Sequence, residues 1–306
     1  MSRVVQMIRR NADGIDELVL DVAGPEMGAQ GVLLGKGSLK AMYHAPRTTP
    51  QQVLASLPGA IPSRDRVETR VFTLIVRTEA HGGDSWEDVD SLLWSVARPG
   101  VYWIIRVESD DGGEAREITV RRTGTPKLTA PDGTDPARAG YAVWEIEVTA
   151  FDPWWYGPPV VDEFVNPSSG THSETLVLPN TGDHDAWLRW IIRESEAAQT
   201  WTIPDGLGVY PEGHAKAGQR IMHTLPELAA GKHGMVDTSP QRIPLSVLDE
   251  PMAFGKLRQT RWTHAIPPSR GGEGPFEFPV TVTGSATAGI RVKLTPRYER
   301  PYGRTL

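Results

Sequence analysis

Short strand-like stretches bounded by turn residues recur along this chain and constrain its fold more than any other feature. Beyond residue 160 they fall at 175–178, 186–193, 200–203, 220–225, 234–237, 276–283 and 289–296. Turn residues such as those at 180–183 and 204–206 separate them. Many short strands at this spacing predict an antiparallel β-sandwich.

The first half of the chain combines similar stretches with a single helix. Its expected strands are 4–8, 15–22, 67–78, 101–107, 118–122 and 141–150, with turns at 11–14 and 110–113. The first two strands and their turn predict a β-hairpin. Strands before and after one helix indicate an α+β domain, so the whole chain is expected to be mainly β.

The expected helix spans 85–97. Asp84 or Ser85 provides its N-cap, and acidic residues follow in the first turn, where the helix dipole favours them. The candidates for its core-facing stripe share a helical spacing and are Trp86, Val89 and Leu93. Trp94 lies off that stripe and is a candidate for core packing or for a contact between subunits.

A segment rich in glycine and proline, 23–62, lies inside the first half. We expect an extended loop with short strand pieces. Loops of this length in a compact domain are usually functional. Reaching a neighbouring subunit is one such function.

The aromatic segment 151–157, which contains Pro153, divides the chain. Proline cannot continue a central strand, so the preceding strand ends there. We predict two domains, 1–157 and 158–306. The residues expected to pack at the joint between them are Trp154, Trp155 and Tyr156.

Composition excludes several classes of protein. The chain has 306 residues with 39% hydrophobic and 23% charged residues, which is typical of a globular protein of two domains. It has no cysteine, so disulfide frameworks and thiolate metal sites are excluded. Its net charge of −6 and scattered basic residues give no electrostatic reason to hold nucleic acid. No secretory signal or membrane segment is expected.

Motifs for catalysis or ligand binding fail on spacing. The glycine-rich stretch 31–38 lacks the spacing of a phosphate loop, 183–185 lacks further metal ligands, and 110–113 lacks the ligands of a calcium loop. The histidines are dispersed, and no nucleophile elbow accompanies them. A triad or a carboxylate pair built from distant residues stays open. We assign no catalytic, cofactor or metal site and expect no enzyme.

Several motifs, in this order, resemble a known family. The first half ends in Ala-Phe-Asp-Pro-Trp-Trp-Tyr at 150–156. The second half contains further matching stretches at 180–183, 186–190, 201–206, 225–231, 236–240, 266–268 and 298–303. The chain resembles the distal tail proteins of siphophages, in the form common among minor tail proteins of actinobacterial phages.

The resemblance implies a structural virion protein of a long non-contractile tail, assembled in the host cytoplasm. The first domain, a β-sandwich or split barrel with one helix, would form a hexameric ring at the end of the tail tube. The second domain would be a galectin-like sandwich outside the ring. The implied partners are the tail-tube, tail hub and tape-measure proteins, with DNA only in transit through the lumen.

Two rival hypotheses remain. In the first, the chain is another minor tail protein of the same fold, and in the second, it is a carbohydrate-binding module of the tail tip. The second hypothesis requires exposed tryptophans that stack on sugar rings, with candidates Trp187, Trp190, Trp201 and Trp262.

Overall fold

The computed structural model describes residues 3–38, 42–53, 60–63, 65–109, 113–131, 133–257, 260–269 and 274–303. The chain forms two compact units. One consists of Met1–Gly157 together with Tyr298–Arg304, and the other consists of Pro158–Arg297. The C-terminal residues from Tyr298 therefore cluster with the first unit, whereas the sequence placed them in the second domain. A turn was expected at 110–113, but 110–112 lie outside the described residues.

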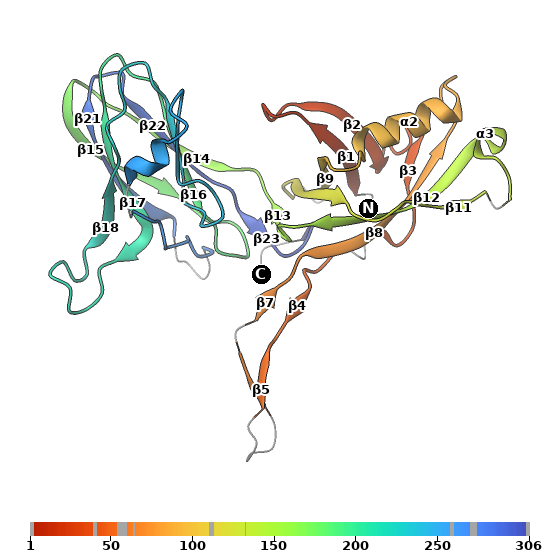
Figure 1. The fold of residues 1–306 in the computed structure, drawn as a ribbon, viewed down its shortest axis with the longest axis horizontal. Helices are drawn as coiled ribbons and strands as arrows, with labels where there is room; N and C mark the ends of the chain where they lie inside the picture. Colours follow the sequence, from red (N-terminus) through yellow and green to blue (C-terminus); the bar gives the residue numbers. More distant parts are fainter. Residues whose placement is uncertain are drawn as a thin grey trace. The chain divides into compact units, whose positions relative to one another are not determined.

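The first unit is built on one large antiparallel sheet that curls into a nearly closed barrel (Figure 1). Its main path runs β2-β1-β9-β10-β12-β8-β3. These strands are β1 (Val4–Arg10), β2 (Asp16–Ala23), β3 (Val32–Leu34), β8 (Arg70–Glu79), β9 (Tyr102–Glu108), β10 (Arg116–Arg122) and β12 (Tyr141–Ala150). The remaining strands are β11 (Lys127–Ala130), β13 (Trp155–Tyr156) and β23 (Arg297–Tyr298).

Alternation along the strands produces the core of this unit. In β8, Phe72, Leu74 and Val76 are buried, while the alternating residues Val71 and Thr73 are exposed. Period-two alternation puts the buried set on one face of the sheet. The mainly β prediction is therefore confirmed, and each strand expected in the first half is present.

Helix α2 (Trp86–Val96) packs against this core through Val89, Leu93 and Val96. Ser85 is its N-cap, and a capping box joins the Ser85 and Asp88 side chains to each other's backbone N–H groups. A second, one-turn helix, α3 (Pro136–Ala139), escaped prediction because its four residues show no helical periodicity.

Part of the glycine-rich segment forms a β-hairpin arm, which we define as the described residues 47–53, 60–63 and 65–67. Two short antiparallel ladders follow one another along it, β4 (Arg47–Thr48) with β7 (Arg66–Val67) and β5 (Gln51–Val53) with β6 (Ala60–Pro62). The arm leads away from the large sheet of its own unit (Figure 1). The expected extended loop is thus partly an ordered ribbon, because backbone pairing across the segment is not visible in local sequence.

The second unit is a sandwich of two antiparallel sheets. One has the order β14-β22-β16-β19-β20 and the other has the order β15-β21-β17-β18. Their bounds are β14 (Val160–Val165), β15 (Gly170–Leu178), β16 (Leu188–Ile192), β17 (Thr200–Val209), β18 (Arg220–Thr224), β19 (Gly234–Asp237), β20 (Leu245–Val247), β21 (Phe276–Gly284) and β22 (Gly289–Leu294). A short 3-10 helix, η1 (Ala253–Leu257), follows β20.

The antiparallel sandwich predicted for this half is confirmed. Every strand expected from the sequence is present, while β14 and β20 were missed. Both lie at the ends of the five-stranded sheet, where burial is incomplete and the sequence signal is weak. A specific likeness to galectins stays a prediction.

Candidate interaction surfaces

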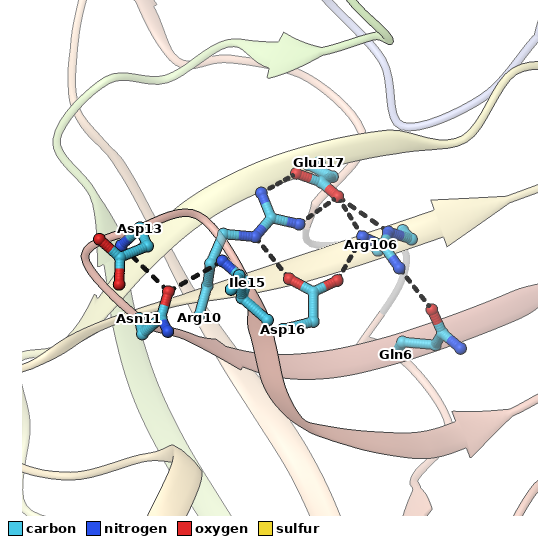
Figure 2. A network of polar contacts seen from close by, with 8 residues as sticks. All are labelled: Gln6, Arg10, Asn11, Asp13, Ile15, Asp16, Arg106 and Glu117. Carbon is cyan, nitrogen blue, oxygen red and sulfur yellow. Dashed lines mark hydrogen bonds and ion pairs between the residues drawn. The ribbon is translucent and has the colours of Figure 1, made fainter.

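A closed network of charged side chains spans four neighbouring strands of the first unit (Figure 2). Its members are Arg10 on β1, Asp16 on β2, Arg106 on β9 and Glu117 on β10. The strand register brings them together, because Arg10 pairs with Asp16 and Arg106 pairs with Glu117. The network therefore links residues that are far apart in the sequence.

Each arginine of this network contacts both acids. Arg10 donates to the two Glu117 carboxylate oxygens at 2.8 and 2.9 Å and to Asp16 at 2.5 Å. Arg106 donates from Nη2 to Asp16 at 2.9 Å and from Nε to Glu117 at 2.8 Å. The Gln6 side-chain oxygen accepts a further bond from Arg106 at 3.3 Å. Two cations and two anions thus neutralise one another.

The network keeps both acids ionised. The pKa of Asp16 is lowered chiefly because Arg10 donates a hydrogen bond to its carboxylate. Burial opposes ionisation of Glu117, but hydrogen bonds from Arg10 and Arg106 outweigh it, and the pKa of Glu117 is lowered. Because the charges cancel, we interpret the network as a structural link across four strands rather than a ligand site.

A rigid turn beside this network presents an apolar side chain. The Asn11 side-chain oxygen accepts the N–H groups of Asp13 and Ile15 at 3.0 and 2.9 Å (Figure 2). Gly14, with φ of 83°, allows the tight connection. Ile15 is 62% exposed. An exposed apolar residue on a preorganised turn is a candidate contact for another protein.

Asp90 joins a tryptophan of helix α2 to a tryptophan of strand β12. Its carboxylate accepts the indole N–H of Trp94 at 2.8 Å and that of Trp144 at 2.7 Å. Trp86 donates to Thr78 at 3.0 Å instead. The predicted stripe is buried at Val89 and Leu93, whereas Trp86 is half-buried.

Trp94 is also half-buried, and its ring packs edge-on against Trp144 with centroids 5.2 Å apart. It belongs to the margin of the first unit's core. A contact between subunits through its exposed part stays a prediction.

The predicted joint residues lie in the first unit. Trp155 is fully buried in its core, and its indole N–H donates to the Met42 carbonyl at 3.4 Å. The Tyr156 hydroxyl donates to Asp152 at 2.5 Å, and Trp154 is half-buried. The role of Trp154, Trp155 and Tyr156 in setting the angle between domains stays a prediction.

Two buried arginines were not singled out from the sequence. Arg70 donates to the carbonyls of Pro153, at 3.0 and 2.7 Å, of Glu299, at 3.1 Å, and of Met42. Burial lowers the pKa of Arg70 to about 10, while the charge of Glu299 opposes this. The sequence did contain an indication that Arg70 is buried, because it has the same alternation as the core residues of β8 that start at Phe72.

The second buried arginine holds the end of the chain. Arg116 donates to the carbonyls of Arg300 and Gly303, both at 2.8 Å. Its guanidinium lies 3.6 Å from the ring centroid of Tyr298, a cation–π contact. Arginine satisfies several carbonyls at once, so both arginines fasten residues 298–303 to the first unit.

Exposed apolar side chains gather on the outer face of the sheet, near the start of β8, the start of β9 and the end of β12. Val71 pairs with Thr149 on β12, and Arg121 on β10 pairs with both Thr149 and Tyr102. Phe151 packs edge-on against Tyr102 at 6.4 Å. Val71, Tyr102 and Phe151 are each about half exposed, so this surface is a candidate protein contact.

The tryptophans proposed for sugar stacking are mostly inside the sandwich. Trp190, Trp201 and Trp262 are buried, and only Trp187 is half-buried. The expectation that Trp190, Trp201 and Trp262 form an exposed platform is wrong. Alternating residues on β16 and β17 that point inward fill the core between the two sheets.

One buried acid of the second unit organises a loop. Asp205 accepts the backbone N–H of Thr263 at 2.8 Å and lies 2.9 Å from the His264 ring nitrogen Nδ1. His223 is close by, and burial lowers its pKa, although the charge of Asp205 opposes this. Trp262 packs edge-on against His223 at 5.2 Å. The Thr263 hydroxyl lies 3.1 Å from the same His264 nitrogen and donates to Asp205 at 3.0 Å, so we interpret this cluster as a structural anchor for the loop.

Turn 183–185 is likewise structural. The backbone N–H groups of Asp183 and His184 donate to the Arg297 carbonyl at 2.7 and 3.2 Å. Within the described ranges, no group of histidine and acidic residues is arranged to hold a metal ion. Among the same residues, no helix combines the length and the apolar character needed to cross a bilayer.

Comparisons with known proteins give a likeness in structure alone. Neither the protein-family models nor the curated proteins match this sequence. Among solved structures, the SPP1 Dit (gp 19.1) protein superposes with a TM-score of 0.56 and 13% identity, over 96% of this chain and 98% of that chain. This chain shares the fold of SPP1 Dit. That protein is described as a paradigm of the hub adsorption apparatus in phages that infect Gram-positive hosts.

A weaker match covers all of this chain and all of a chain from the phage P2 baseplate, with 9% identity and a TM-score of 0.48. The resemblance to distal tail proteins noted from the sequence is confirmed by the SPP1 Dit fold. The match to SPP1 Dit spans nearly the whole chain, so it includes both units of this chain and not the sandwich alone.

Proposed function

We propose that this chain is a structural subunit of a phage tail tip, forming a ring at the distal end of a non-contractile tail tube. The observation that carries the proposal is the fold shared with SPP1 Dit over 96% of the chain. The order of sequence motifs from 150–156 to 298–303 supports it independently. The ring would connect the tube to the hub of the tail tip.

The surfaces of the first unit fit such a role. A closed ring is heterologous, so each subunit must present two different surfaces to its neighbours. The arm is one candidate, because its ladders have only two strands and its described residues from 47 to 52 are exposed. The patch of Val71, Tyr102 and Phe151 and the turn at Ile15 are others.

In this proposal the ring is a homohexamer. Its partners are the tail-tube protein, the tail hub protein and the tape-measure protein, and DNA passes through the lumen only in transit. The protein acts in the virion, after assembly in the host cytoplasm. It has no catalytic step, and the charge network of Figure 2 serves to hold strands together.

Native mass spectrometry of the purified chain, alone and with tube and hub proteins, tests the proposal. We expect a hexamer, and electron microscopy of the same sample should show a ring. A chain that stays monomeric with both partners present would overturn the proposal. A glycan array serves as the rival test, since sugar binding that depends on Trp187 would favour the carbohydrate-binding module.

A further inference from the structure

The chain returns to the first unit after building the second. It leaves through β13 and comes back through β23, and these two strands pair with each other beside β10. We call residues 298–303 the strap. The strap is thus the last piece of the first unit, although almost the whole second unit separates it from the rest in sequence.

Two buried arginines hold the strap. Arg70 donates to the Glu299 carbonyl at 3.1 Å, and Arg116 donates to the carbonyls of Arg300 and Gly303 at 2.8 Å. Both arginines are buried. Charged donors inside a protein bond strongly and are costly to leave unpaired, so the strap is a fixed part of the unit.

The strap also holds the chain where it enters the arm. We call residues 42–46 the arm root. The Glu299 carboxylate accepts the backbone N–H of Ala45 at 3.0 Å and a bond from Arg47, the first residue of the arm, at 2.7 Å. Glu299 is mostly buried, with 12% of its side chain exposed. A buried carboxylate with two donors on one chain segment fixes the direction of that segment.

Aromatic contacts reinforce this attachment. Tyr43 of the arm root packs edge-on against Tyr302 of the strap, with centroids 5.3 Å apart. Arg300 approaches the Tyr43 hydroxyl at 3.4 Å. The Arg3 guanidinium also lies 3.5 Å from the Tyr302 ring centroid.

We propose that the strap is a clamp that fixes the arm root, so that the arm is presented to a neighbouring copy of this chain only when the strap is seated. An isolated two-stranded ribbon is marginally stable in water and does not hold its own direction. The clamp supplies that direction through Glu299. The second half of this inference, presentation to a neighbour, rests on the proposed ring function.

The test is hydrogen exchange of the Glu299→Ala variant, measured on the full chain at a concentration where it is monomeric. We expect the amide of Ala45 and peptides covering 42–53 to exchange at least about tenfold faster, the factor that corresponds to losing about 1.4 kcal/mol. Peptides from β8 and β12 should be unchanged. Unchanged exchange at 42–53 would overturn the clamp.

Glu163→Ala is the matched control. Glu163 is a carboxylate that likewise has two hydrogen-bond donors, here Arg193 and Arg291, but it lies in the second unit. It should leave exchange at 42–53 at the wild-type rate. If Glu299→Ala fails to fold, Arg47→Ala removes the bond from the arm side alone, and faster exchange at 42–53 is again expected.

Native mass spectrometry of the same variants separates the two halves of the inference. If wild-type chain forms rings and Glu299→Ala does not, presentation of the arm by the strap is supported. If both form rings equally while exchange at 42–53 rises, the role in presentation is overturned. If the wild type forms no ring, the proposed function fails, whereas the exchange result still decides the clamp.

Discussion

At the scale of single residues, the first unit uses arginine in two different ways. Arg10 and Arg106 lie on the half-exposed outer face and are neutralised by Asp16 and Glu117. Arg70 is buried, and its hydrogen bonds to the described residues end on backbone carbonyls. The first arrangement responds to pH because acids take part, whereas the second joins chain segments at any ordinary pH.

The Glu117 network predicts an acid-dependent loss of stability. The pKa of Glu117 is lower in the folded chain than in the unfolded one, so the folded state is stabilised above the unfolded pKa, which is near 4.3. This stability should be lost as pH falls from about 5 through the folded pKa. Thermal unfolding of Glu117→Gln at a series of pH values checks it. The variant should be less stable at pH 7, with a flatter profile below pH 5 than the wild type.

Trp155 predicts a large effect on stability. Trp155→Ala removes a fully buried ring from the core and should cost about 3–5 kcal/mol in the free energy of unfolding. Denaturant unfolding followed by fluorescence measures it. Trp154→Ala, at a half-buried position, should cost clearly less. Equal losses in the two variants would contradict this packing.

This difference also determines how the joint hypothesis is tested. Loss of assembly in a variant lacking Trp155 would follow from a damaged core alone. Trp154→Ala changes the same segment with less damage. A changed angle between domains in that variant, seen by electron microscopy of the ring, would support the joint.

At the scale of elements, local sequence signals explain which helices and strands form, and contacts between distant residues explain where these elements lie. Helix α2 carries its own start signal at Ser85 and its own buried stripe. Strand β8 similarly shows its burial pattern in sequence. The arm ladders instead depend on backbone pairing across 47–67, which neither short strand announces by its composition.

The cap of helix α2 gives a prediction at this scale. Ser85→Ala removes the side-chain oxygen that accepts the Asp88 N–H at 3.2 Å, and should lower the free energy of unfolding by about 1 kcal/mol. Thermal or denaturant unfolding checks it. Ser91→Ala, inside the same helix, is the control and should be neutral or slightly stabilising, because alanine is the better helix former.

At the scale of the whole molecule, the second unit is an insertion between β13 and β23 of the first. The two ends of the insertion are adjacent, because these strands pair with each other. Both units have their own hydrophobic core. Each is therefore expected to fold as a unit of its own.

Excision of the insertion tests this organisation. A chain in which a short glycine-rich linker replaces 158–297 and the strap is kept should unfold cooperatively. The same chain without residues 298–303 should be less stable by at least about 3 kcal/mol, because bonds from Arg70 and Arg116 are lost. Circular dichroism against temperature compares the two. Equal stability would show that the strap contributes nothing to the first unit.

The sequence by itself determined most strands of the two units, although not β14 and β20, as well as helix α2 and the end of β12 before Pro153, because alternation, capping and proline act within a few residues of one another. It also carried the resemblance that the SPP1 Dit fold confirms. The rival hypothesis of sugar stacking named Trp190, Trp201 and Trp262, which are in fact buried, since composition does not say which face of a strand turns inward.

Only the tertiary structure decided that 298–303 completes the first unit and that Arg70 and Arg116 lie inside it. From sequence alone, a charged residue in a strand is predicted to be exposed. The hydrogen-bond partners that allow Arg70 and Arg116 to be buried are backbone carbonyls distant in sequence. Such carbonyls exist at every residue, so no local pattern marks the ones that will be used. Long-range pairing, not residue type, places the strap against the arm root.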